Sequence, residues 1–204
     1  MAQALSEAVA RKGIASLAVS GGRTPEQVFP RLTHAKLPWE RIVITLTDER
    51  WVPPDHPESN EGLARRLLLS GPAGKARFIG LWTRAPAPRA GLAEAEARLA
   101  GLPWPLDAVF LGMGGDGHFA SLFPGDPALG ERRARLAAAR APAAPESRIT
   151  LTYPAFLEAG FLALAAQGDE KQAALAKALQ PGPPEEAPLR ILLAERRRPI
   201  AVFG

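Results

Sequence analysis

The amino-acid sequence predicts one α/β domain over residues 1–204, with a mostly parallel sheet flanked by helices. The chain has 204 residues, which is enough to bury one sizeable core and short for two independent ones. Short β-rich runs alternate with helical patterns along it. Strands separated by helices indicate right-handed crossovers between parallel strands.

Six short runs of apolar and β-branched residues are expected to form the strands. Branched side chains pack well on a pleated surface, and the run RIVITLT is the clearest example. In chain order, the expected strands are 14–20, 41–47, 107–112, 148–153, 160–167 and 198–204.

Four helices are expected around these strands: 1–13, 25–35, 59–71 and 169–182. The first alternates charged residues with alanine, which is typical of an amphipathic helix and not of a signal peptide. The second starts with Pro25, an allowed first-turn residue. The third has Ser59 or Asn60 as its N-cap and stops at Gly71. The stretches rich in proline and alanine are expected to be surface loops: 84–92 and 140–147.

Composition excludes several classes of function. The chain has no cysteine, which excludes a disulfide framework, thiolate catalysis and a cysteine metal site and is compatible with the cytoplasm. Its histidines, His34, His56 and His118, are too far apart in sequence to bind a metal from one helix, so no metal is expected. No run of 18 apolar residues is present, so no membrane span is expected.

The net charge of +4 is a mild basic excess that suits an anionic substrate. Proteins that bind nucleic acid usually concentrate basic residues in one stripe. The only dense basic run here is RRR at 196–198, which we interpret as a solvated turn. No nucleic-acid partner is expected.

Three polar motifs each follow an expected strand. SGGRTP follows 14–20, TDERWVP follows 41–47, and GMGGDGH starts at the end of 107–112. In open α/β sheets, ligands bind beyond the carboxyl ends of the strands. We therefore expect these motifs, distant in the chain, to meet at one edge of the sheet.

The motif SGGRTP has the features of a phosphate site. Gly21 and Gly22 let the backbone approach a bound group, and the first N–H groups of the following helix carry partial positive charge. Ser20, Arg23 and Thr24 add hydroxyl and guanidinium donors. The alternative is a tight turn capped by Thr24. The motif is not a P-loop, because the glycine–lysine–threonine end is absent.

The motif TDERWVP places Asp48, Glu49 and Arg50 at a strand end. Two interpretations stay open for these charges: a binding site, or a solvated loop. Trp51 is expected to pack under the loop, and His56 is expected to be a turn residue.

The stretch GMGGDGHFASLFPG (112–125) contains more glycine than a turn needs. Glycine costs about 0.5–1 kcal/mol relative to alanine in regular structure. The density of glycine therefore indicates a backbone that approaches a ligand or adopts left-handed geometry. Asp116 lies two residues before His118, and a histidine held by a carboxylate is a usual general base. G-x-G-x-x-G also occurs here, but without the ribose-binding acid of a dinucleotide site.

Two basic residues lie further along the chain. Arg148 opens the expected strand 148–153. Lys171 lies in the first turn of the helix 169–182, where a positive charge opposes the helix dipole. A bound anion would account for Lys171, and a surface lysine is the alternative.

Together, SGGRTP, TDERWVP, HPESN and GMGGDGHFASLFPG resemble, in this order, the 6-phosphogluconolactonase family. That family belongs with the glucosamine-6-phosphate isomerase/deaminase and ribose-5-phosphate isomerase superfamily. The resemblance covers about residues 14–180. It implies a modified Rossmann-like sheet and hydrolysis of 6-phosphoglucono-1,5-lactone in the oxidative pentose phosphate pathway, without a metal or an organic cofactor. The implied partner is this small sugar-phosphate lactone. A cytoplasmic monomer or weak dimer is expected.

Residue by residue, the resemblance implies that His118 activates water and that Asp116 orients His118. Backbone amides of the glycine loop are candidate donors to the oxyanion. The residues expected to bind the substrate and its phosphate are Ser20, Gly21, Gly22, Arg23, Thr24, Asp48, Arg50, Gly114, Gly115, Arg148 and Lys171. Phe119 replaces a small polar residue common in the family, so it is expected to narrow the pocket. The run ASLF after it is expected to begin a packed helix.

Two other functions stay open. An amino-sugar-phosphate deaminase or isomerase of the same superfamily would use Asp48 as a base. Against it, FASLFPG follows His118 here, where the deaminases resemble IAFNEP. A non-enzymatic sugar-phosphate sensor would keep SGGRTP but would not need His118 beside Asp116.

Overall fold

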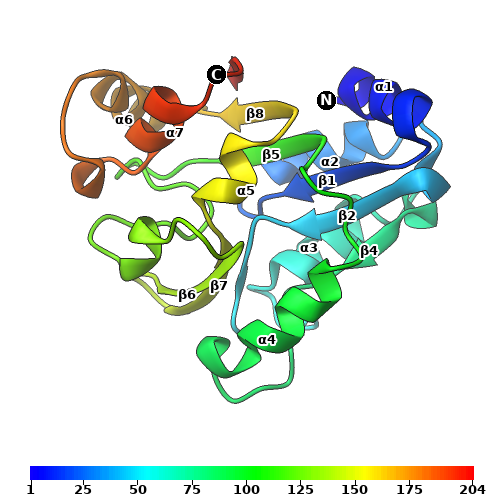
Figure 1. The fold of residues 1–204 in the computed structure, drawn as a ribbon, viewed down its shortest axis with the longest axis horizontal. Coiled ribbons are helices and arrows are strands. Elements are labelled where there is room, and N and C mark those ends of the chain that lie inside the picture. The colour runs from blue at the N-terminus through cyan, green and yellow to red at the C-terminus, as the bar shows by residue number, and fades with distance from the viewer.

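The computed structural model describes residues 1–204, and a six-stranded parallel sheet forms its centre (Figure 1). The strand order is β4-β2-β1-β5-β8-β9, and every neighbouring pair is parallel. A smaller antiparallel sheet has the order β3-β7-β6. The strands are β1 (Ala15–Val19), β2 (Ile42–Leu46), β3 (Asp48–Arg50), β4 (Arg77–Ile79), β5 (Ala108–Gly112), β6 (Leu136–Arg140), β7 (Ser147–Leu151), β8 (Phe161–Ala165) and β9 (Ile200–Phe203). The predicted α/β class with a mostly parallel sheet is confirmed.

The central strands are apolar because the sheet is covered on both faces. Every residue of β1 and β2 is buried, in the sequences ASLAV and IVITL. Buried parallel strands read as continuous apolar runs rather than as alternating ones. Their side chains belong to one hydrophobic core that extends through the whole chain.

The helices connect and cover these strands (Figure 1). They are α1 (Ala2–Lys12), α2 (Pro25–Leu32), α3 (Asn60–Leu67), α4 (Pro88–Leu99), α5 (Tyr153–Leu157), α6 (Asp169–Leu179) and α7 (Leu189–Glu195). Short 3-10 turns occur at Trp39–Arg41, Pro72–Lys75, Pro127–Gly130 and Pro184–Glu186. Four of the seven helices were expected, and Ser59 caps α3 by accepting a hydrogen bond from the N–H of Gly62. None of the helices has the length and apolar character needed to span a membrane.

The sequence predicted a surface loop over 84–92, but the second half of this stretch is helical. Helix α4 begins at Pro88, with Pro88 in the first turn and no side-chain cap. Proline is well tolerated at that position, where its missing N–H is not needed. The helix packs against β6 and β7, and this tertiary contact stabilises a helix that has little local signal.

Two further expectations need correction. The strand at 148–153 exists as β7, but it pairs antiparallel with β3 and β6 instead of joining the main sheet. The run ASLF does not begin a helix. Residues 113–122 form a compact turn with isolated bridges between Met113 and Phe119 and between Phe119 and Leu122.

The basic run at 196–198 is not a fully solvated turn. Arg196 is only 8% exposed. Its guanidinium donates to the carbonyls that end α5 and follow it, those of Phe156, Leu157 and Ala159. Free carbonyls at a helix C-terminus attract cations, so this arginine ties α5 to the segment before β9.

The strand order locates the crevice of the sheet. From the neighbouring strands β1 and β5, the chain proceeds outward in both directions, to β2 and β4 on one side and to β8 and β9 on the other. Such a switch point leaves a crevice at the carboxyl ends of the two strands. There the N–H of Ser20 donates to the carbonyl of Phe110 at 3.0 Å, which joins the end of β1 to β5.

Candidate active site

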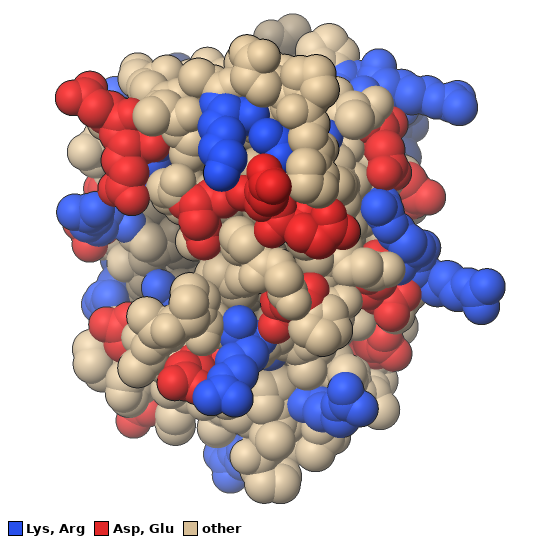
Figure 2. Space-filling view, turned by 90° about the vertical axis from the view of Figure 1, so that its left-hand side faces the viewer, with Lys and Arg blue, Asp and Glu red and all other residues tan.

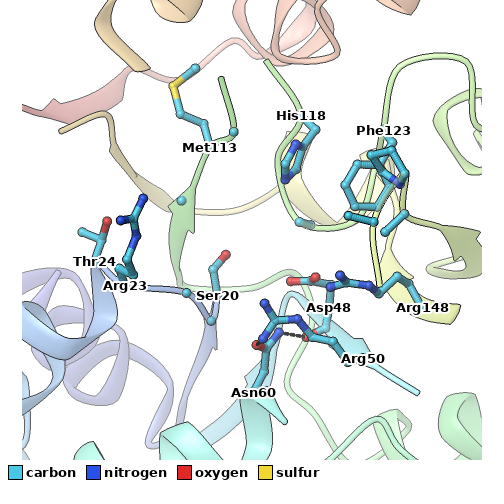
Figure 3. Close-up of a pocket in the computed structure, with 18 of the residues that line it drawn as sticks. Ser20, Arg23, Thr24, Asp48, Arg50, Asn60, Met113, His118, Phe123 and Arg148 are labelled. Atoms are coloured by element: carbon cyan, nitrogen blue, oxygen red, sulfur yellow. Dashed lines mark hydrogen bonds between the residues drawn. The ribbon is translucent and has the colours of Figure 1, made fainter. Parts of the chain in front are cut away.

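A pocket lies in this crevice, and the three polar motifs meet in it (Figure 3). Its lining residues come from the loops after β1 and β5, from β3, from α3 and α6, and from the β6–β7 hairpin. They are Ser20, Gly21, Gly22, Arg23, Thr24, Asp48, Arg50, Asn60, Gly112, Met113, Gly114, His118, Ala120, Phe123, Ala141, Pro142, Ala143, Ala144, Arg148 and Lys171. The predicted convergence of the motifs at one edge of the sheet is confirmed.

The loop from Ser20 to Thr24 presents unused backbone donors to the pocket. The N–H groups of Gly21, Gly22, Arg23 and Thr24 donate to no backbone carbonyl. Gly22 has φ of 98°, which a residue with a side chain adopts only with strain. Free amides just before a helix form a suitable site for an anion.

Arg50 is held beside this loop by Asn60, a residue that the sequence analysis did not assign to the site. Nη1 of Arg50 donates to Oδ1 of Asn60 at 2.5 Å and to the carbonyl of Glu58 at 2.9 Å. Asn60 Nδ2 donates to the carbonyl of Asp48 at 2.8 Å. A Cβ on Gly21 would lie 1.8 Å from Asn60 Oδ1, so the absence of a side chain at Gly21 makes room for Asn60.

Glu49 is a fully buried carboxylate behind the pocket, not a solvated loop charge. Its two oxygens accept from the N–H groups of Arg50, Asn60 and Glu61 and from the hydroxyl of Ser59. Burial raises the pKa of Glu49 to about 7, although these four donors favour the ionised form. Glu49 therefore fixes the start of α3, which carries Asn60.

Asp48 lies in the pocket wall and links it to the glycine loop. The carboxylate accepts from the hydroxyl of Thr47 at 3.0 Å and from that of Ser121 at 2.6 Å. Thr47 in turn hydrogen-bonds Ser20 at 2.7 Å. A chain of hydroxyls thus connects the ends of β1 and β2 to the turn after His118. Ser121 is fully buried, and nothing in its local sequence indicates this contact.

His118 and Asp116 form a hydrogen-bonded pair. Nδ1 of His118 lies 2.6 Å from Oδ1 of Asp116, which also accepts from the His118 N–H at 3.0 Å. Partial burial raises the pKa of Asp116, but the hydrogen bond and charge of His118 outweigh it and hold that pKa below its usual value. Asp116 does not line the pocket and contacts His118 from outside it. With Nδ1 paired to a carboxylate, Nε2 is the nitrogen left for chemistry.

Two N–H groups of the glycine loop, those of Gly114 and Gly117, bond within the loop and are not available as the expected oxyanion donors. The N–H of Gly114 donates to the carbonyl of His118 at 2.9 Å, so it is not free for an oxyanion. Gly115 is not among the lining residues, and a Cβ on it would lie 1.9 Å from Oε1 of Glu170. A Cβ on Gly114 would lie 2.2 Å from Cε1 of His118. These glycines provide space for neighbouring side chains.

Phe119 does not narrow the pocket. Its side chain is fully buried and packs edge-on against Tyr153 and Phe156, with ring centroids 5.7 and 5.4 Å away. The aromatic residue in the pocket wall is Phe123, whose ring centroid lies 4.5 Å from that of His118. Two phenylalanines in one loop differ only in which way the turn directs them, and local sequence does not reveal that.

The remaining wall combines cations with small side chains. Arg148 is 9% exposed, and its Nε donates to the carbonyl of Pro145 at 2.8 Å. Burial lowers the pKa of Arg148, an effect that the charge of Asp48 opposes, and an arginine stays charged at neutral pH. Arg23, Arg50 and Lys171 complete the basic lining. The turn of the β6–β7 hairpin adds only Ala141, Pro142, Ala143 and Ala144.

Charge elsewhere on the molecule is mixed. The face in Figure 2 carries basic and acidic side chains over the same surface, so the net charge of +4 is not gathered into one patch there. No group of three or more histidine, aspartate or glutamate side chains is arranged to hold a metal ion.

The fold and the pocket are those of an α/β protein with a basic crevice at the switch point of its sheet. Residues 1–200 match the family model described as glucosamine-6-phosphate isomerases/6-phosphogluconolactonase, and the chain belongs to this family.

Within the family, three similar proteins are 6-phosphogluconolactonases. That of Mesorhizobium japonicum is 41% identical over 208 residues, which cover 100% of this chain and 87% of the relative. That of Pseudomonas putida is 43% identical over 95% of this chain and 81% of the relative. The crystal structure of a 6-phosphogluconolactonase from Shewanella baltica has a TM-score of 0.95 at 40% identity, covering 99% of this chain and 88% of that one.

Proposed function

We propose that this protein hydrolyses 6-phosphoglucono-1,5-lactone to 6-phosphogluconate in the pentose phosphate pathway, with His118 as the general base. The observation that carries the proposal is the His118–Asp116 pair, with 2.6 Å between Nδ1 and Oδ1, in a loop that closes the same pocket as the Ser20–Thr24 loop. The names of the relatives support the same substrate.

The phosphate of the substrate binds at one end of the pocket. The free amides from Gly21 to Thr24 receive its oxygens, and Arg50 approaches from the side where Asn60 holds it. Arg148, Arg23 and Lys171 add positive charge. Binding energy from this remote group fixes the position of the lactone ring and reduces the entropy cost of reaction.

Hydrolysis takes place at the His118 end. Nε2 of His118 removes a proton from water as the water oxygen attacks the C1 carbonyl, and Asp116 stabilises the imidazolium that forms. The bond between C1 and the ring oxygen then breaks, and the imidazolium returns the proton to that oxygen. Because the Gly114 amide is occupied, the cationic lining of the pocket supplies the positive potential that stabilises the oxyanion.

We also propose that residues 1–204 act as one lactonase domain, which the single hydrophobic core supports. The cytoplasmic location and the monomer or weak dimer expected from the sequence stay predictions.

The test is acid release from freshly prepared lactone, with the wild type compared to His118→Ala. The wild type is expected to accelerate hydrolysis well above the spontaneous rate, and His118→Ala is expected to lose about 10²–10⁴-fold in kcat. Near-full activity of His118→Ala would overturn the assignment of the base. Ammonia release from glucosamine 6-phosphate would instead indicate the deaminase, with Asp48 as its base, and binding of sugar phosphates without turnover would indicate a sensor.

A further inference from the structure

Phe123 packs against the imidazole of His118 in the pocket wall (Figure 3). We propose that Phe123 is a positioning residue, which holds the His118 ring so that Nε2 faces the substrate. The inference rests on the proposed role of His118 as the base.

The hydrogen bond to Asp116 does not hold the imidazole by itself. It fixes one ring nitrogen and leaves the ring free to rotate about the direction of that bond. The side chains of His118 and Asp116 are 29% and 40% exposed, and exposed pairs hold their geometry weakly. A second contact from a different direction is required to fix the orientation of the ring.

Phe123 provides this second contact. Its ring centroid lies 4.5 Å from that of His118, with the two planes at 47°. Phe123 is only 6% exposed, so close packing by its neighbours restricts its own rotamer. The two restraints are complementary. The hydrogen bond to Asp116 fixes the position of Nδ1, and the contact with Phe123 prevents the imidazole from rotating about that bond.

The loop contains its own control. Phe119 lies four residues before Phe123 and is also buried, but it packs on Tyr153 and Phe156 and does not line the pocket. The same substitution at the two positions removes similar apolar volume. Only at position 123 does it remove a contact with His118.

The experiment measures lactone hydrolysis by Phe123→Leu and Phe119→Leu, each alone and combined with His118→Ala. Phe123→Leu is expected to lower kcat about 10-fold, as a misplaced reacting group does, with KM close to wild type. Phe119→Leu is expected to keep the wild-type kcat even if its Tm falls. In the His118→Ala background, Phe123→Leu is expected to cause no further loss. A spectroscopic signature accompanies these rates: the ring-proton resonances of His118 should move in Phe123→Leu and not in Phe119→Leu.

Several outcomes overturn the proposal: a wild-type kcat for Phe123→Leu, an equal loss in the His118→Ala background, or a change confined to KM. If Phe123→Leu fails to fold, Phe123→Met, whose side chain fills irregular space, replaces it in the same comparison. An active wild type with a normal Phe123→Leu contradicts this inference alone. A wild type that does not accelerate lactone hydrolysis contradicts the proposed function and this inference with it.

Discussion

The two glycine-containing loops of the pocket differ in what their backbones do. In the loop from Ser20 to Thr24, four consecutive N–H groups have no backbone acceptor, and the loop lines the pocket end that we assign to phosphate. In the loop from Gly112 to His118, the N–H groups of Gly114 and Gly117 bond within the loop. The free amides suit the first loop to the anion binding that we propose, whereas the internal hydrogen bonds make the second loop a support for His118. Glycine serves a different purpose in each loop.

This contrast predicts that alanine at equivalent glycines damages different kinetic constants. The strongest effect is expected for Gly114→Ala, whose Cβ would meet the His118 ring at 2.2 Å. Because the imidazole must move, kcat should fall by about 10²-fold or more while KM changes little. Steady-state kinetics with the lactone measures this. The matched control is Gly130→Ala, where a new Cβ has nothing within 4 Å. A larger change in KM than in kcat for Gly114→Ala would show that the two loops are not specialised.

A smaller effect of the opposite kind is expected for Gly21→Ala. The Cβ would displace the amide of Asn60, and with it the Arg50 guanidinium that Asn60 holds. Losing one charge-assisted contact to phosphate should raise KM about 10-fold and affect kcat less. Inhibition by inorganic phosphate should weaken in parallel, which gives a readout independent of turnover. If inhibition by inorganic phosphate were unchanged in Gly21→Ala, the proposal that this loop binds the anion would be wrong.

The smallest effect is expected for the pH dependence of stability, to which Glu49, the buried carboxylate behind the pocket, contributes. Burial raises its pKa to about 7, so the unfolded chain loses this proton at a lower pH than the folded protein does. Between those two pKa values the folded state binds more protons, and stability falls as the pH rises. We expect the unfolding free energy of the wild type to fall by about 1 kcal/mol between pH 5 and pH 6.

In Glu49→Gln this contribution to the pH dependence is absent, and urea unfolding at the two pH values compares the variants. Equal slopes in both proteins would show that the four hydrogen-bond donors keep Glu49 ionised over this range.

The sequence predicted the position of the loop from Ser20 to Thr24 at the pocket well, and the internal organisation of the glycine loop poorly. The motif SGGRTP carries its information locally, because free amides, two glycines and a helix start are adjacent in the chain. The contacts of Ser121 with Asp48 and of Asn60 with Arg50 join residues far apart or around a turn. A residue type and its spacing do not reveal such partners before the chain is folded.

The same limit explains the errors in the fold. The apolar residues of helix α4 are not concentrated on one face of the helix, so the sequence gives little signal of it. Its packing against β6 and β7 stabilises the helical conformation. Strand β7 has the composition of a central strand but pairs with the three-residue strand β3, which begins at Asp48, two residues after β2 ends at Leu46. Arg196 differs from its neighbours in the basic run only in facing the C-terminal end of α5.

The hairpin turn between β6 and β7 is the part of the pocket wall that has no such constraints. The loops after β1 and β5 leave no space for a side chain at Gly21 or Gly114, and Asp48 is tied to Ser121. At the turn, by contrast, Pro142, Ala143 and Ala144 line the pocket and are exposed to solvent. Changes in substrate size or polarity can therefore be introduced there by single substitutions without rebuilding the rest of the site. To make the pocket accept another phosphorylated lactone, these three positions are the ones to substitute, because the rest of the pocket wall is tightly packed.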